Sequence, residues 1–383
     1  MEYRIFGNTG LEISALGFGC MRLPVVDGDH SKIDEERAAA MLRYAIDRGV
    51  NYLDTAYTYH SESFSRPGSS EPFLARALED GYRERVHLAT KLPAWLVQAP
   101  GDLERYLDEQ LERLGAETID FYLIHSLNQG TWERMKVHGV TSFLDRAIRE
   151  GKIRYAGFSF HDHLELFREI VDAYPWTFCQ ILYNYYDVNF QAGMEGSKYA
   201  ADRGLAVVVM EPLRGGALVK GLPAEARRIL KKAGPERSEA EWALRWTWSH
   251  PGVSTVLSGM STMEQVKENV ELAGRVSAAP WSGADEQAIE GASRVIRRLQ
   301  RVDCTDCRYC MPCPEGVDIP RNFSFCNDHH MLKDPSAKMR YFGFLNEKQR
   351  ASACVECGEC EDQCPQQIPI IRELKHVVEL FEN

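Results

Sequence analysis

A regular alternation over residues 1 to about 275 constrains the fold more than any other feature. A short β-branched or aromatic run is followed by a loop and an amphipathic stretch, and this unit occurs eight times. Apolar residues in the amphipathic stretches recur at intervals of three and four, as in helices, while the short continuously apolar runs are typical of strands buried on both faces. Eight such pairs in this length predict an α/β fold, a (β/α)8 TIM barrel.

The individual elements follow from the same pattern. The expected strands cover residues 14–19, 51–56, 85–91, 119–125, 153–160, 178–184, 205–212 and 254–259. The expected helices cover 34–48, 71–80, 102–114, 143–150, 164–173, 194–203, 238–248 and 262–272. Residues 3–16 predict a hairpin that turns at 7–10. A doubly wound nucleotide fold is the alternative, but "GFGCMR" has Arg22 where its fingerprint needs a third glycine.

Charge and composition narrow the range of partners. The net charge is −11, and basic residues are scattered among acidic ones, which argues against binding to nucleic acid or to an anionic membrane. The first residues lack a signal pattern and no apolar run reaches the length of a membrane span, so we expect a cytoplasmic protein. In that reducing compartment, clustered cysteines are more often metal ligands than disulfides.

The alternation stops near residue 275, which predicts a second domain. We expect a barrel over 1–275, a linker and helix over 276–300, and a small, mainly α-helical cysteine-rich domain over 301–383. Within the barrel, 60–70 and 131–139 are extra segments that follow strands. Because barrel enzymes build their sites from such loops, both are candidates for lids or substrate loops.

Four ionisable residues lie at or just after the ends of successive expected strands: Asp54, Tyr59, Lys91 and His125. Each alone has a structural explanation, as a turn residue, loop packing, a solvated strand end or a buried histidine, but the four together favour a catalytic site. A lysine ammonium held by Asp54 would lower the pKa of Tyr59 from about 10 towards neutrality. A histidine beside the tyrosine can donate a hydrogen bond to a carbonyl oxygen as negative charge develops there.

The motifs "NYLDTAYTYH", "LATK", "DFYLIHS", "GKIRYAGFSF", "MEPLRGGAL" and "STVLSGMSTMEQVKEN" together resemble the aldo-keto reductases over residues 1–274. The resemblance implies a barrel that binds NADP or NAD, with Tyr59 as general acid beside Asp54, Lys91 and His125. It also implies cofactor contacts at these positions: Gly19, Cys20, Met21, Asp54, Ser159, Gln180, Met210, Glu211, Leu213, Gly215, Gly259, Gln265 and Asn269.

The sequence departs from the family pattern at four positions, which are among these cofactor positions or next to one of them. Phe160 stands where asparagine is usual, and Met210 where an aromatic residue stacks on nicotinamide. Gly259 and Gln265 occupy the positions of the basic residues that grip the 2′-phosphate of NADP. A phosphate is best bound by arginine or lysine, so NAD is as good a candidate as NADP.

Eight of the 11 cysteines lie in two runs near the end of the chain. The second, Cys354, Cys357, Cys360 and Cys364-Pro365, has the spacing C-x2-C-x2-C-x3-C-P of cubane iron–sulfur proteins. The first, Cys304, Cys307, Cys310 and Cys313-Pro314, is one residue shorter before its last cysteine. Zinc sites account for C-x2-C pairs but not for this triple spacing, so we favour 4Fe–4S clusters.

In two-cluster ferredoxins the fourth cysteine of each run ligates the other cluster. Accordingly we expect one cluster on Cys304, Cys307, Cys310 and Cys364 and another on Cys354, Cys357, Cys360 and Cys313, with one cluster as the minimum. The helical pattern between the runs resembles the α-helical ferredoxin modules fused to oxidoreductases. We interpret Cys20, Cys179 and Cys326 as ordinary buried thiols, and both 161–163 and His329-His330 as solvated loops.

The expected function is oxidoreduction of a small-molecule aldehyde or ketone, or of the alcohol, with nicotinamide and two 4Fe–4S clusters. The clusters would serve electron transfer to a redox partner protein, redox sensing or structure. A second hypothesis is a redox-sensing or electron-transfer adaptor whose barrel binds nicotinamide with little turnover. A third is a sugar-phosphate lyase or isomerase on the same barrel.

Overall fold

A computed structural model describes residues 1–383 except 64, 278–279, 305–308, 335 and 365. The chain divides into two compact units. The first comprises Met1–Leu213 and Glu241–Ser282, and the second comprises Arg214–Ala240 and Gly283–Asn383. The segment 214–240, which the sequence pattern placed with the barrel, therefore belongs to the unit that carries the cysteine runs.

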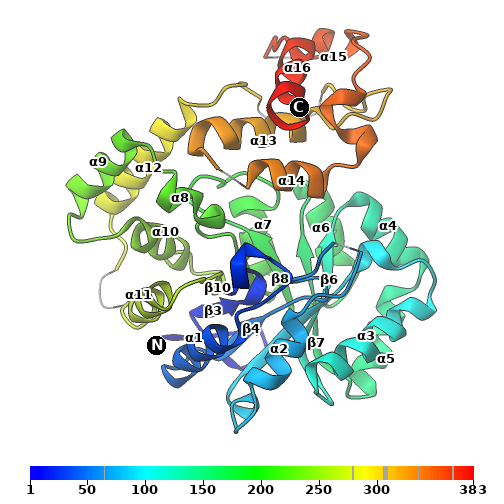
Figure 1. Ribbon diagram of the computed structural model, residues 1–383, viewed down its shortest axis with the longest axis vertical. Coiled ribbons are helices and arrows are strands. Elements are labelled where there is room, and N and C mark those ends of the chain that lie inside the picture. The colour runs from blue at the N-terminus through cyan, green and yellow to red at the C-terminus, as the bar shows by residue number, and fades with distance from the viewer. Residues whose placement is uncertain (64, 278–279, 305–308, 335, 365) are drawn as a thin grey trace. The chain divides into compact units, whose positions relative to one another are not determined.

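The first unit is a closed barrel of parallel strands in the order β10-β3-β4-β5-β6-β7-β8-β9 (Figure 1). β10 pairs with both β9 and β3, which closes the sheet and leaves it without an edge. The strands are β3 Leu16–Gly19, β4 Tyr52–Asp54, β5 His87–Leu92, β6 Ile119–Leu127, β7 Ile153–Phe160, β8 Phe178–Leu182, β9 Ala206–Met210 and β10 Val253–Ser258. The predicted (β/α)8 fold is confirmed.

Helices follow each strand and bury their apolar faces. They are α1 Glu35–Asp47, α2 Ser70–Ala77, α3 Gly101–Leu114, α5 Val140–Arg149, α6 Leu164–Ala173, α7 Gly193–Ala201, α10 Glu239–Trp248 and α11 Met263–Ala273. Side chains cap several of their first turns: Asp34 accepts from the Arg37 amide, and Thr262 accepts from the Gln265 amide. Helix starts thus coincide with the polar residues that the sequence places there.

The predicted hairpin, β1 Tyr3–Ile5 and β2 Glu12–Ser14, fills one end of the barrel. It delivers Phe6, which is fully buried, onto the rings of Phe121 at 4.6 Å, Phe178 at 5.5 Å and Tyr52 at 5.9 Å between centroids. Tyr52 and Phe178 begin their strands, so this plug occupies the N-terminal end. A functional site would therefore be expected at the opposite end of the barrel, where the strands end.

One of the two segments expected to be lids is helical. Residues 129–137 form α4 Gln129–Val137, which begins with a capping box between Asn128 and Thr131. Trp132 and Met135 on this helix are buried. The sequence interpretation missed the helix because its apolar residues are few, and its buried side chains make it a packed element rather than an open loop.

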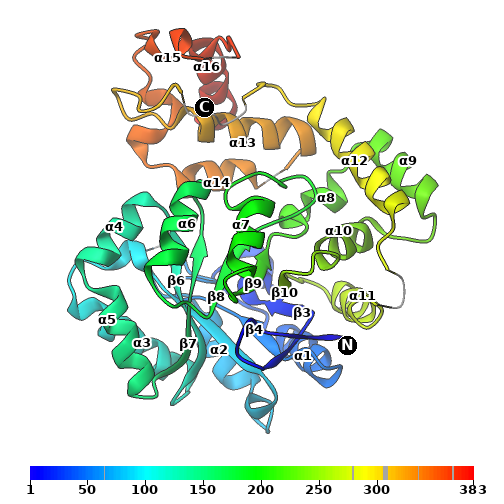
Figure 2. The ribbon, with the colours of Figure 1, turned by 180° about the vertical axis from the view of Figure 1, so that it is seen from behind.

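The second unit consists of helices in its described residues (Figure 2): α8 Ala217–Lys220, α9 Ala224–Ala233, α12 Gly283–Arg297, α13 Ile319–Leu332, α14 Ala337–Phe344, α15 Glu359–Asp362 and α16 Ile370–Phe381. α9 packs on α12, and Arg214 forms a buried ion pair with Asp328 at 2.6 Å. These contacts explain why 214–240 groups with this unit. Among the described residues, no helix has the length and apolar character required to traverse a bilayer.

Candidate functional site

The ends of β4, β5 and β6 bring together the four ionisable residues singled out in the sequence. Lys91 is fully buried, and its Nζ donates to Asp54 Oδ1 at 2.7 Å, to the Thr55 carbonyl at 2.7 Å and to the Tyr59 hydroxyl at 3.1 Å. β4 and β5 are neighbours, and Tyr59 lies in the loop after β4, so a single ammonium can reach all three groups. The lysine therefore fixes the position of the tyrosine hydroxyl.

His125 completes the group from β6. Its ring lies 6.1 Å from that of Tyr59 between centroids, edge to face, and 5.0 Å from that of Trp95. Its Nδ1 is buried and has no hydrogen-bond partner among the described residues. The His125 ring therefore lies beside the Tyr59 ring at the end of β6.

The expected direction of the Tyr59 pKa shift is wrong. Burial raises the pKa of the Tyr59 hydroxyl above its usual range, and the nearby Lys91 ammonium, which lowers it, does not outweigh burial. Burial also raises the pKa of Asp54, against the opposing effect of Lys91. Burial lowers the pKa of Lys91, but the nearby charges of Asp54 and Tyr59 raise it by a larger amount. The net pKa of Lys91 is therefore raised. At neutral pH Tyr59 is therefore a protonated phenol whose hydroxyl contacts the Lys91 ammonium. In this form the phenol can act as a proton donor.

His125 is neutral at neutral pH. Burial lowers the pKa of its imidazole well below the usual range, and the charges of Lys91 and His161 act in the same direction. A neutral imidazole carries one N–H and one lone pair, so it can donate a hydrogen bond without competing with Tyr59 as an acid.

A buried polar network lies behind Lys91, and the sequence interpretation missed it. The Glu71 carboxylate accepts from Thr90 Oγ1 at 2.7 Å, from Gln110 Nε2 at 2.7 Å and from Arg113 Nε at 2.8 Å. Gln110 Nε2 also donates to the Lys91 carbonyl at 3.1 Å. Glu71 and Gln110 are polar residues on the otherwise apolar buried faces of α2 and α3. Polar residues at these positions are the sequence signal from which the network could have been predicted.

The loop after β4 approaches Tyr59 closely at Gly68. A Cβ at this glycine would lie 1.9 Å from the Tyr59 carbonyl oxygen and 2.6 Å from its carbon. The Gly68 amide donates to the Tyr57 carbonyl at 2.8 Å. Only a residue without a side chain fits here, so Gly68 determines where the tyrosine backbone lies.

We expect Gly68→Ala to lower kcat about 100-fold, because a shift of about 1 Å in a catalytic group has an effect of that size. Gly101→Ala is the matched control, since a Cβ at Gly101 would have no heavy atom within 4 Å and its activity should be unchanged. Steady-state kinetics and circular dichroism test this. Unchanged kcat in a folded Gly68→Ala enzyme would show that the loop does not position Tyr59.

The side chains expected to hold a nicotinamide carboxamide lie on adjacent strands. Ser159 on β7 is the register partner of Gln180 on β8. Ser159 Oγ accepts from the Ser126 amide at 2.7 Å, which leaves its hydroxyl hydrogen to donate. Gln180 Nε2 lies 3.6 Å from Met210 Sδ, while its buried Oε1 has no hydrogen-bond partner among the described residues. An amide ligand would satisfy both groups, so these residues fit the carboxamide.

The remaining expected cofactor residues occupy the ends of three other strands. Gly19 ends β3 and Cys20 and Met21 begin the turn after it, while Glu211 and Leu213 follow β9. At the start of α11, Gln265 Oε1 accepts from the Ser261 amide at 2.8 Å and the buried Asn269 donates to Ser258 Oγ at 2.9 Å. Gly215 lies in the turn Arg214–Gly216 of the second unit.

Arg22 is a further candidate that sequence reasoning passed over. A Cβ at Gly259 would lie 3.1 Å from Arg22 Cδ, so the aliphatic part of this arginine covers the glycine. Gly259 is one of the two uncharged positions where the resemblance called for a basic residue. A positive charge therefore lies beside the expected phosphate region although it comes from a different loop, which a linear motif does not reveal.

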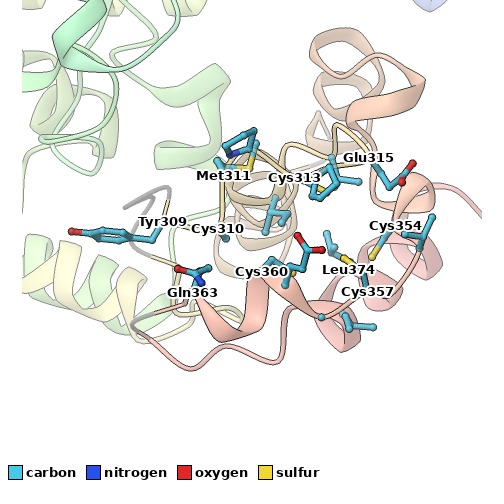
Figure 3. A pocket seen from close by; sticks show the side chains of 18 residues that line it. Tyr309, Cys310, Met311, Cys313, Glu315, Cys354, Cys357, Cys360, Gln363 and Leu374 are labelled. Carbon is cyan, nitrogen blue, oxygen red and sulfur yellow. The ribbon is translucent and has the colours of Figure 1, made fainter.

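In the second unit, both cysteine runs line one cavity of about 210 Å³ (Figure 3). Cys313 and Cys310 come from the first run and Cys354, Cys357 and Cys360 from the second. The described cysteines are all free thiols. Cysteines of both runs around one cavity are what crossed ligation of 4Fe–4S clusters needs, and the set expected from the sequence, Cys313, Cys354, Cys357 and Cys360, lies entirely within this lining.

The other expected set is described in part, because Cys307 lies outside the described residues. Burial raises the pKa of the Cys310 thiol to about 12, and its neighbours Cys304, Cys360 and Cys364 act in the same direction. Burial likewise raises the pKa of Cys360 to about 11, with Cys354 and Cys313 among the contributing neighbours. Thiols raise each other's pKa only when they are close. Cys360 and Cys364 of the second run are thus near Cys310 of the first run, and Cys313 of the first run is near Cys360 of the second.

Comparisons with known proteins bear on both units. A model of the Aldo/keto reductase family matches residues 15–278, and a model of a 4Fe-4S dicluster domain matches residues 303–368. L-galactose dehydrogenase of Arabidopsis thaliana is 27% identical over 321 residues, covering 79% of this chain and 96% of the relative. L-glyceraldehyde 3-phosphate reductase of Escherichia coli K12 is 27% identical over 318 residues, covering 71% and 87%. An aldo-keto reductase structure from Bacillus halodurans, in its holo form, superposes with a TM-score of 0.62 at 26% identity, covering 76% of this chain and 96% of that one.

Proposed function

This chain belongs to the aldo-keto reductase family and carries a 4Fe–4S domain, and on that premise we propose that it reduces a small aldehyde or ketone, or oxidises the alcohol, with a nicotinamide dinucleotide. The observation that carries the proposal is the contact of Lys91 Nζ with both Asp54 and the Tyr59 hydroxyl, at 2.7 and 3.1 Å, beside the His125 ring. The relatives whose names give an activity are a dehydrogenase and a reductase of small molecules.

The cofactor would supply hydride to the carbonyl carbon. Ser159 would hold its carboxamide through the hydroxyl hydrogen, and Gln180 through the buried Oε1 that has no hydrogen-bond partner in the described part of the chain. Tyr59 donates its proton to the carbonyl oxygen, and Lys91 stabilises the phenolate that remains. The neutral His125 orients the same oxygen by a hydrogen bond, and the plugged N-terminal end of the barrel confines substrate to this side.

The raised Tyr59 pKa predicts different pH profiles in the two directions. Reduction needs the phenol, which persists below the raised pKa, so its rate should stay level from neutral pH to about pH 10. Oxidation needs the phenolate, which is scarce at neutral pH, so its rate should rise with pH over the same range. Initial rates in both directions test this. If the reduction rate already declines with rising pH before about pH 8 is reached, the tyrosine pKa is lowered instead of raised.

We further propose two 4Fe–4S clusters, one on Cys313, Cys354, Cys357 and Cys360 and the other on Cys304, Cys307, Cys310 and Cys364. Cys357 is exposed, which favours a cluster close to the surface of its unit and accessible to a redox partner protein. Each cluster carries one electron at a time, so exchange with a one-electron partner needs no converter within the domain.

The experiment that tests the function is an assay of anaerobically purified protein. Short aldehydes and ketones are offered with NADH or NADPH, and loss of the reduced nicotinamide is followed. Turnover with either cofactor supports the reductase. Tight binding of both with no turnover on any carbonyl or alcohol would favour the adaptor, and activity without nicotinamide would favour a lyase or isomerase.

A further inference from the structure

Two helices of the second unit bring a cysteine and two histidines together away from the cysteine runs. Cys326 and His330 are four residues apart on α13, so they share one face of it, and His376 comes from α16, which packs against α13. One ligating atom from each of the three lies within 4.8 Å of the others. The interpretation of His329-His330 as a solvated loop is wrong, because both lie within a helix.

The spacing of these atoms suits a tetrahedral metal site. His330 Nε2 and His376 Nε2 are 3.0 Å apart. With zinc–nitrogen bonds of about 2.0–2.1 Å, two nitrogen ligands of a tetrahedral ion are about 3.3 Å apart, which needs only a small adjustment. The two imidazole planes are inclined at 27° and their centroids are 5.2 Å apart.

The alternative is a hydrogen bond between two neutral imidazoles. That pairing would account for the short nitrogen–nitrogen distance, but it does not involve the buried Cys326 thiol, whose sulfur lies within 4.8 Å of a nitrogen of each histidine. Thiolate sulfur and imidazole nitrogen are both zinc ligands, and a set of two histidines and one cysteine also binds copper. The group therefore offers three potential metal ligands, one more than the histidine pair alone.

The surroundings supply the other requirements of a zinc site. Glu379 Oε2 lies 4.0 Å from His376 Nδ1, too far for a hydrogen bond but on the side of the ring where a carboxylate can approach a ligating imidazole. His330 and His376 are partly exposed, so water can reach a fourth coordination position. Cys326 belongs to the apolar core of the unit, which includes Phe323 and Val377.

We propose that Cys326, His330 and His376 bind one zinc ion that joins α13 to α16. The same core carries six partly buried cysteines of the two runs: Cys304, Cys310, Cys313, Cys354, Cys360 and Cys364. With three protein ligands and a water, the ion would link α13 to α16 and so stabilise the core against which the cysteine-bearing segments pack.

The test uses full-length protein purified anaerobically from cells supplied with zinc. Metal analysis should find about one zinc per chain, and zinc-edge X-ray absorption should show one sulfur with nitrogen and oxygen neighbours. His330→Gln and His376→Gln should lose the zinc and keep the iron. His329→Gln is the matched control, since it removes a neighbouring imidazole of α13 outside the cluster, and it should keep both metals.

Cys326→Ser provides a second readout, because any zinc that remains should lose its sulfur neighbour. The proposal is overturned if the wild-type protein holds no zinc. It is also overturned if both histidine variants keep the zinc, or if the absorption shows four sulfur neighbours, which would place zinc among the cysteine runs.

Discussion

Replacing Tyr59 with phenylalanine is expected to lower kcat for carbonyl reduction by a factor of about 10² to 10⁴, the contribution of a positioned general acid. The variant keeps the ring and deletes only the hydroxyl that receives the 3.1 Å contact from Lys91. Cofactor affinity should change little, because the expected carboxamide contacts come from Ser159 and Gln180. Stopped-flow hydride transfer, with nicotinamide binding measured separately, distinguishes the two effects.

Tyr57→Phe is the matched control for this experiment. Tyr57 is two residues away in the same loop, and its hydroxyl donates to Glu109 Oε1 at 2.9 Å, away from Lys91. The same deletion there should leave kcat within a few-fold of wild type. Equal rates in Tyr59→Phe and wild type would reject the proton-donor role and leave the adaptor hypothesis.

The second large effect concerns the crossed arrangement of the cysteines. We expect Cys313→Ser to remove the same cluster as Cys357→Ser although the two belong to different runs, because Cys313 is one of the close neighbours of Cys360 in the second run. Cys364→Ser should instead match Cys304→Ser. In each variant, iron should fall from about eight to about four per chain. Iron analysis and electron paramagnetic resonance of the reduced protein identify which cluster remains.

Cys179→Ser is the control for these cysteine variants, because Cys179 is a buried thiol of the barrel and its loss should leave the iron count unchanged. If Cys313→Ser and Cys304→Ser leave the same cluster behind, each run ligates its own cluster. A wild-type protein with about four irons would reduce the proposal to a single site.

The barrel was predictable because its signals are local. Each strand lies buried on both faces and reads as a short apolar run, and each helix shows its period within a dozen residues. β7 begins and ends at the expected residues. α4 was missed for the converse reason: its burial depends on Trp132 and Met135, too few apolar residues to mark a period.

The residues of the candidate site could be predicted from the sequence, but the pKa values of those residues could not. Parallel strands end at one face of a barrel, so Asp54, Lys91 and His125 had to be neighbours once the fold was known. The Tyr59 pKa depends on how burial and the Lys91 charge balance, and that balance is a property of the packed site.

The amino-acid sequence by itself determined the barrel, the four residues at its strand ends and the iron–sulfur character of the cysteine runs, because spacing along one chain is enough to specify each of them. Tertiary structure alone decided that 214–240 joins the cysteine-bearing unit, that Gly68 positions Tyr59, and that His376 meets Cys326 and His330. Each of these depends on contacts between segments distant in sequence, and no local period or spacing encodes such contacts.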